Sequence, residues 1–264
     1  MLILRRCIIV ALAVCSIALS TAAQTNKAIE ADLLRHLTNL EKASGVSGAR
    51  NEAAVDKENK ILKQNFLLYG KKAATLKYDF KALAGKMTIT TSKDGKFRIY
   101  SWDNEFGGTM RDHENIFQYQ AKGGQVYAYL VPRGREGDVH GFYHQIFQVD
   151  TPTGRVYLAN STFIASTSLA SQELSLFRTD GKKLNSNVRL IQTKTRLTNS
   201  VGFQYDFFSV VDHPERPVKL FFYDEAKKSF RFPVVIEDAQ TPQGRVTKKF
   251  ITYRFNGKYF VKVR

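Results

Sequence analysis

The feature that most constrains the fold is a pattern that begins after residue 72, where short runs of Val, Ile, Thr, Tyr and Phe are separated by Gly, Asp, Asn and Pro. Alternating runs between tight turns are typical of antiparallel strands with one buried face. We predict about a dozen strands, at 87–91, 96–101, 116–120, 125–131, 144–150, 155–159, 173–179, 188–193, 202–208, 218–223, 230–236, 245–253 and 258–263. The pattern predicts an antiparallel β barrel or sandwich.

Two predicted turns share the string Thr-Pro-x-Gly-Arg-Val, beginning at Thr151 and Thr241. Pro at the second position and Gly at the fourth are favoured in β-turns. The recurrence leaves propeller-like hairpin repeats open as an alternative fold. A barrel or sandwich is preferred because propeller blades need roughly 40 residues or more.

The apolar pattern of residues 24–72 predicts a helical hairpin. Apolar residues recur every three or four positions along one face, at Ile29, Leu33, Leu37, Leu40 and again at Val55, Leu62, Phe66, Tyr69. The repeat is too short for a free coiled-coil arm, so we expect the hairpin to pack on the β domain of residues 73–264. The expected class is mainly β (α+β).

Residues 1–23 have the order of a secretory signal peptide. Arg5 and Arg6 precede an apolar run over 7–19 and small residues at 20–23. That run is shorter than the ~20 residues needed to cross a bilayer. We therefore expect export and cleavage, and a mature protein that is periplasmic or extracellular.

Both cysteines, Cys7 and Cys15, lie in the segment expected to be removed. A lipid anchor through Cys15 is not expected, because the bulky Val14 precedes it where lipoprotein signals have a small residue. The mature chain then has no disulfide, thiolate nucleophile or Cys metal ligand, and must be stabilised by an ordinary hydrophobic core.

The chain is strongly basic, with 40 Lys and Arg against 24 Asp and Glu, a net charge of +16. Such an excess favours anionic partners, which for an exported protein means an anionic glycan, a lipid headgroup or an envelope protein. No phosphate-binding glycine motif occurs, so no nucleotide cofactor is expected.

Aromatic and basic residues alternate at 230–232 and 249–254. That alternation suits a stacking platform for single-stranded nucleic acid, but a strand with one buried face gives the same string. A nucleic-acid partner is not expected for an exported protein.

The stretch 101–115 is the densest in chemically useful side chains. An exposed Trp beside paired carboxylates could stack a sugar ring and attack its glycosidic bond. The predicted binding residues are Trp102, Asp103, Glu105, Arg111, Asp112, His113 and Glu114. The structural alternative is a polar loop whose Trp points into the core.

Two other constellations are weaker. The residues between and after His140 and His144 favour an extended strand, along which four residues span about 13 Å, too far for the two rings to share a metal ion. Ser209, Asp212 and His213 are the right types for a hydrolase, but no Gly-x-Ser-x-Gly string occurs. We therefore predict a non-catalytic exported binding protein without a cofactor, with a carbohydrate-active hydrolase that uses the carboxylates of 102–114 as the alternative.

Overall fold

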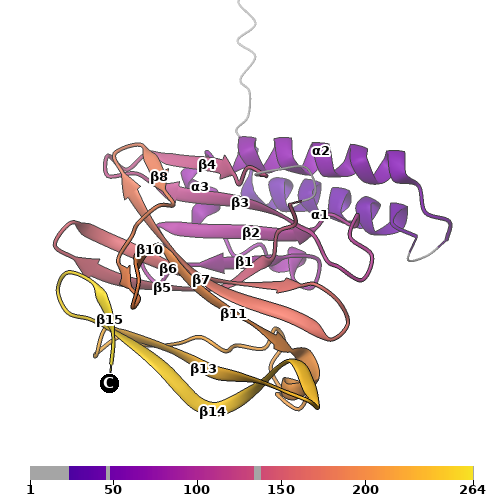
Figure 1. Ribbon diagram of the computed structural model, residues 1–264. Helices are drawn as coiled ribbons and strands as arrows, with labels where there is room; N and C mark the ends of the chain where they lie inside the picture. Colours follow the sequence, from indigo (N-terminus) through magenta and orange to yellow (C-terminus); the bar gives the residue numbers. More distant parts are fainter. Residues whose placement is uncertain (1–23, 46–47, 134–137, 264) are drawn as a thin grey trace, which may run out of the picture.

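The computed structural model describes residues 24–45, 48–133 and 138–263, and the expected signal peptide lies outside them. Four layers are stacked: a pair of helices and three sheets built almost entirely of antiparallel strands (Figure 1). The predicted class, a mainly β fold with an N-terminal helical hairpin, is confirmed. Because the sheets stack as layers, the fold is a multilayered sandwich rather than a ring of propeller blades.

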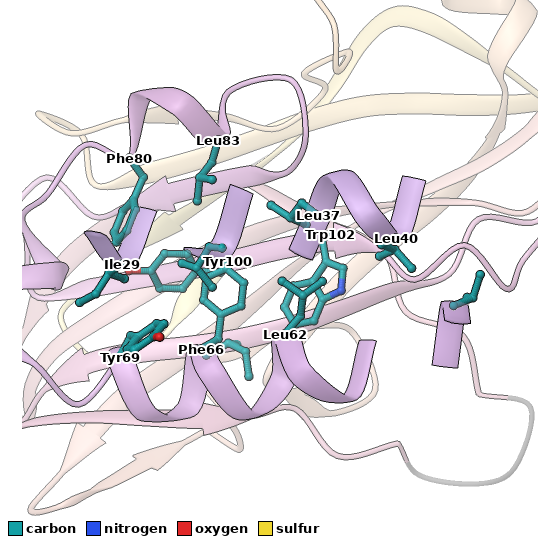
Figure 2. Close-up of a cluster of buried hydrophobic side chains, with 13 residues drawn as sticks. Ile29, Leu37, Leu40, Leu62, Phe66, Tyr69, Phe80, Leu83, Tyr100 and Trp102 are labelled. Carbon is teal, nitrogen blue, oxygen red and sulfur yellow. The ribbon is translucent and has the colours of Figure 1, made fainter. Parts of the chain in front are cut away.

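Helices α1 (Asn26–Ala43) and α2 (Glu52–Tyr69) form the outer layer. The side chains of Thr25 and Asn51 accept backbone N–H groups of the first turns and cap the two helices. Their apolar stripes enter one core with the first sheet, shown in Figure 2. The hairpin therefore packs on the β domain, as predicted.

The first sheet has the order β1 (Thr88–Thr91), β2 (Phe97–Asp103), β3 (His113–Gln120), β4 (Val126–Leu130). The short α3 (Ala73–Leu76) and η1 (Lys81–Leu83) connect it to the helices. Strand β2 is buried on both faces: Tyr100 and Trp102 point to the helices, while Phe97 and Ile99 point to the second sheet. This sheet is therefore an inner layer.

The second sheet has the order β11 (Ser200–Asp206), β7 (Leu169–Asp180), β6 (Gly154–Ile164), β5 (Phe142–Thr151), with β8 (Lys183–Asn185) paired to β7. The third has the order β10 (Leu197–Thr198), β9 (Ile191–Gln192), β15 (Phe260–Lys262), β14 (Thr241–Phe255), β13 (Ser229–Asp238), β12 (Phe222–Asp224). Fully buried Leu158, Leu174, Phe230 and Phe260 join the two sheets. The outer face of the third sheet closes the stack.

One predicted turn is wrong. Thr241 already belongs to β14, and the chain reverses three residues earlier than predicted, between Asp238 and Thr241. Asp238 Oδ1 accepts the N–H groups of Gln240 and Thr241, which stabilises the earlier reversal. The first copy does turn, between Thr151 and Gly154. The two strings therefore adopt different structures and do not mark a repeated unit.

Candidate functional site

The predicted site stretch is less of a loop than the sequence suggested. Strand β2 extends to Asp103 and β3 begins at His113, so only residues 104–112 connect them. Trp102 pairs with Glu114 in the antiparallel ladder. The connection between the predicted strands 96–101 and 116–120 is therefore shorter than expected, because this pairing extends both strands.

Trp102 lies in the core and is 1% exposed. Its ring stacks on Phe66 at a centroid distance of 5.2 Å, and its indole N–H donates to Asn59 Oδ1 at 3.0 Å. The Asn59 amide also donates to the Asn104 carbonyl oxygen at 2.8 Å, which ties the start of the 104–112 loop to α2. Trp102 cannot stack a sugar, so its predicted binding role is corrected to a core role.

Asp112 and Glu114 converge on one guanidinium. Arg133 Nη1 lies 2.7 Å from Asp112 Oδ2, and Nη2 lies 3.1 Å from Glu114 Oε1. Lys63 on α2 reaches the same Glu114 oxygen at 3.3 Å. Both carboxylates are buried, with side chains 10% and 6% exposed. The network fixes the end of the 104–112 loop to the helical layer.

The environment of Asp112 keeps it ionised. Burial acts to raise the pKa of its carboxyl, but hydrogen bonds from the His140 N–H, the Asn104 amide and Arg133 outweigh burial, and the pKa falls below its usual value. A carboxylate held in this way is a poor general acid, because it carries no proton near neutral pH. Its role here is structural.

Asp103, Glu105 and Arg111 form a second, more exposed group. Arg111 Nη1 lies 3.1 Å from Asp103 Oδ2 and 4.0 Å from Glu105 Oε2. Burial, followed by the charge of Asp103, raises the pKa of Glu105. Arg111 is the one member of this group that lines the adjacent pocket described below.

The rings of His113 and His144 both contact that of Phe142. Their rings are 5.0 and 5.7 Å from the Phe142 ring, measured between centroids. Burial lowers the pKa of His113 and lowers that of His144 to about 4. His144 Nε2 lies 2.8 Å from Thr162 Oγ1. At neutral pH both rings are uncharged, so they support an apolar wall.

That wall belongs to a pocket of about 460 Å³ at one end of the second sheet. Five segments contribute: the 104–112 loop, the start of β5, the β6–β7 hairpin, the end of β11 with η2 (Phe207–Val210), and residues 216–218. The lining residues are Gly108, Thr109, Arg111, Phe142, Thr162, Ile164, Ser166, Thr167, Ala170, Tyr205, Phe207, Arg216, Pro217 and Val218.

The pocket is apolar with a cationic component. Ala170, Tyr205 and Val218 are among its buried lining residues and belong to one hydrophobic cluster. The charged lining residues, among those that the structure describes, are Arg111 and Arg216, with no Asp or Glu. Apolar walls with a few polar groups that orient the ligand are the usual composition of a small-molecule site.

Arg216 is held by backbone groups rather than by an acid. Its Nη2 donates to the Val211 carbonyl oxygen at 2.7 Å, and its Nη1 donates to those of Glu215, at 2.9 Å, and His213. Its guanidinium carbon lies 5.5 Å from the centre of the Phe207 ring. Across residues 24–45, 48–133 and 138–263, no carboxylate forms an ion pair with it. Its charge is therefore available to a ligand.

Two glycines permit the close packing of this region. A Cβ on Gly141 would lie 2.2 Å from the Thr162 carbonyl oxygen, and one on Gly107 would lie 1.9 Å from that of Met110. Both distances are shorter than non-bonded atoms allow. The 104–112 loop and the start of β5 can therefore take these paths only because the side chains are absent.

Sequence reasoning found one pocket residue, Arg111, among the seven predicted and missed the apolar ones. The residues around Ser209, Asp212 and His213, which were considered for a serine hydrolase, do reach the pocket, through Phe207 and Arg216. However, the Ser209 hydroxyl donates to the Asp206 carbonyl oxygen and accepts the Val246 N–H. In the sequence, the string Arg216-Pro217-Val218, which places a cation beside apolar residues, could have indicated this part of the pocket.

Comparison with protein-family models, curated proteins and solved structures finds no match. Within the described ranges, no three His, Cys, Asp or Glu side chains are grouped so that they could hold a metal ion. Nor does this part of the chain contain a helix long and apolar enough to cross a membrane.

Proposed function

We propose that the mature protein is an exported, non-catalytic binding protein whose pocket takes an anionic amphiphile, a molecule with an apolar chain and a carboxylate, phosphate or sulfate head. The observation that carries this proposal is an apolar pocket whose charged lining consists of two guanidinium groups. The signal-peptide pattern of residues 1–23 supports the exported location.

Each part of such a ligand has a complement. Burial of the chain against Ile164, Phe142 and Val218 removes apolar surface from water, at about 25 cal/mol per Å². The head can accept charge-assisted hydrogen bonds from Arg216, which has no competing carboxylate among the described residues, and from Arg111, which shares its charge with Asp103. A cationic head would be repelled by the same groups.

The hydrolase alternative is not proposed. It needs an exposed aromatic ring beside two carboxylates that can act as acid and base. Trp102 is buried, and Asp112 and Glu114 are bound to Arg133.

The test is isothermal titration calorimetry of the mature protein with dodecanoate. Ile164→Trp places a larger side chain at a half-buried position of the lining and should abolish binding. Arg216→Gln should weaken dodecanoate binding about tenfold, because a charge-assisted hydrogen bond contributes about 1.5 kcal/mol or more. Arg196→Gln, at an exposed turn outside the pocket, is the matched control and should bind as the wild type does.

The head group is tested with dodecyltrimethylammonium and dodecyl maltoside, which carry cationic and neutral heads on the same chain. We expect both to bind more weakly than dodecanoate, and Arg216→Gln to leave the neutral ligand unaffected. Equal binding of the three detergents, or dodecanoate binding that survives Ile164→Trp, would contradict the proposal.

A further inference from the structure

The outer face of the third sheet has its own composition. Along β13 and β14 the alternation sends Phe230, Phe232 and Tyr253 into the core, where they are at most 8% exposed. Their neighbours Arg231 and Arg254 point to the opposite face and are exposed. Of the interleaved residues, these aromatic side chains therefore lie in the core and these arginines lie on the surface. Other aromatic rings also lie on that surface.

Two of these rings contact one guanidinium. Phe222 on β12 and Phe250 on β14 are 40% and 41% exposed, although both are large and apolar. The Arg231 guanidinium carbon lies 5.5 Å from the first ring centre and 4.6 Å from the second. Cation–π contacts with these two neighbouring rings, whose centroids are 5.8 Å apart, hold this group in place and leave N–H groups free for a ligand.

A hollow of about 320 Å³ lies beside this arrangement. The strand register sets its residues in two rows: Phe222, Arg231 and Thr252 in one, and Asp224, Ser229 and Arg254 in the next. The hollow therefore combines aromatic, cationic, hydroxyl and carboxylate groups within two rows of one sheet face.

This layer concentrates positive charge. Residues 221–263 contain nine Lys and Arg against four Asp and Glu. Three of those acids already have ion-pair partners: Asp224 with Lys227, Glu225 with Lys93 and Asp238 with Arg245. Arg231, Lys248 and Arg254 form no ion pair with any residue that the structure describes. Their charge is available to a partner from outside the chain.

We infer that this face binds an acidic polysaccharide, a chain of sugars that carry carboxylate groups. The Arg231 and Arg254 guanidinium groups match the carboxylates, the exposed edges of Phe222 and Phe250 match the apolar faces of the rings, and the hydroxyl of Thr252 matches a sugar hydroxyl. This site is separate from the amphiphile pocket and does not depend on it.

Two other polyanions fit less well. Bases of a single strand stack on successive parallel faces, but the rings of Phe222 and Phe250 stand at 77° to each other. The Asp224 carboxylate in the hollow can accept hydrogen bonds from sugar hydroxyls, which a DNA strand or a phosphate group does not offer. Proteins bind an anionic bilayer through a protruding apolar surface that enters the lipid, whereas this face has a polar hollow.

The experiment measures binding of the mature protein to polygalacturonate by calorimetry at low salt, where charge attraction is screened least. We expect the double variant Arg231→Gln, Arg254→Gln to lose about tenfold or more in affinity. Both side chains are exposed, so the variant should fold. Phe250→Ala should weaken binding several-fold while leaving the net charge unchanged.

The matched control is Lys57→Gln, Lys122→Gln, which removes two exposed charges from α2 and the β3–β4 turn. If both double variants lose affinity equally, binding depends on net charge and the inference fails. It also fails if oligo-dT or phosphatidylglycerol vesicles bind more tightly than polygalacturonate, or if uncharged dextran competes equally well.

Discussion

Replacing Arg133 with Met tests the network that fixes the 104–112 loop. The change keeps most of the aliphatic stem and removes the guanidinium shared by Asp112 and Glu114. Breaking a buried pair by removing one partner costs about 3–5 kcal/mol. Arg133 is 33% exposed and Asp112 keeps two other donors, so we expect the lower end, about 3 kcal/mol.

Urea denaturation measures this loss. With a slope of about 3 kcal/mol per M for a chain of this size, the midpoint should fall by about 1 M. Lys60→Met removes an exposed ion pair with Asp56 and serves as the control, with an expected loss below about 0.5 kcal/mol.

The pH dependence provides a second check. The pKa of Asp112 is lowered in the folded protein, so its stabilising contribution is present above the unfolded pKa of about 3.9 and is lost as pH falls through the folded value. The difference in free energy of unfolding between the wild type and Arg133→Met should therefore become smaller at acidic pH. A variant within 1 kcal/mol of wild type at pH 7, or a gap that does not change below pH 4, would refute the reasoning.

Two further predictions concern the pocket wall. Gly141→Ala places a Cβ 2.2 Å from the Thr162 carbonyl oxygen and should cost about 1–3 kcal/mol in thermal unfolding, whereas Gly123→Ala, with no atom within 4 Å, should cost far less; equal effects would contradict the packing argument. Burial lowers the pKa of His144 from 6.5 to about 4. The free energy of unfolding therefore keeps the full contribution of the uncharged ring above pH 6.5, and it loses about 3 kcal/mol as the pH falls towards 4. Denaturation at pH 7 and pH 4.5 should show a smaller acid loss for His144→Gln, and identical acid losses would contradict the assignment.

The strands could be predicted because their signal is local. Alternation and turn residues located the longer strands, whereas the short β8 and β10 were missed and other errors arose where a distant contact decided the outcome. Trp102 is an example: alternation shows that it faces one side of β2, but only the packing of α2 makes that side core. Another example is Asp238, whose side chain accepts the N–H of Thr241 and stabilises a turn that precedes the Thr-Pro-Gln-Gly string.

The pocket could not be predicted because it has no local signal. Its two guanidinium groups, Arg111 and Arg216, are more than a hundred residues apart and are brought together by sheet order and connections. Composition indicated that an anionic partner was favoured, which is a statement about the whole surface. Composition could not indicate that two arginines would line the same apolar pocket.

The same alternation keeps the two proposed sites apart. On β13 and β14 a register shift between Pro233 and Val235 resets the alternation, and beyond it the inward residues Val235 and Val246 pack against the cluster that includes the pocket residues Ala170 and Tyr205. The outward residues of these strands, such as Arg231, lie across the sheet from that cluster. A ligand on the outer face can therefore reach the pocket only through the close-packed core between the layers. Loss of polygalacturonate binding without loss of dodecanoate binding would be the direct consequence of this arrangement.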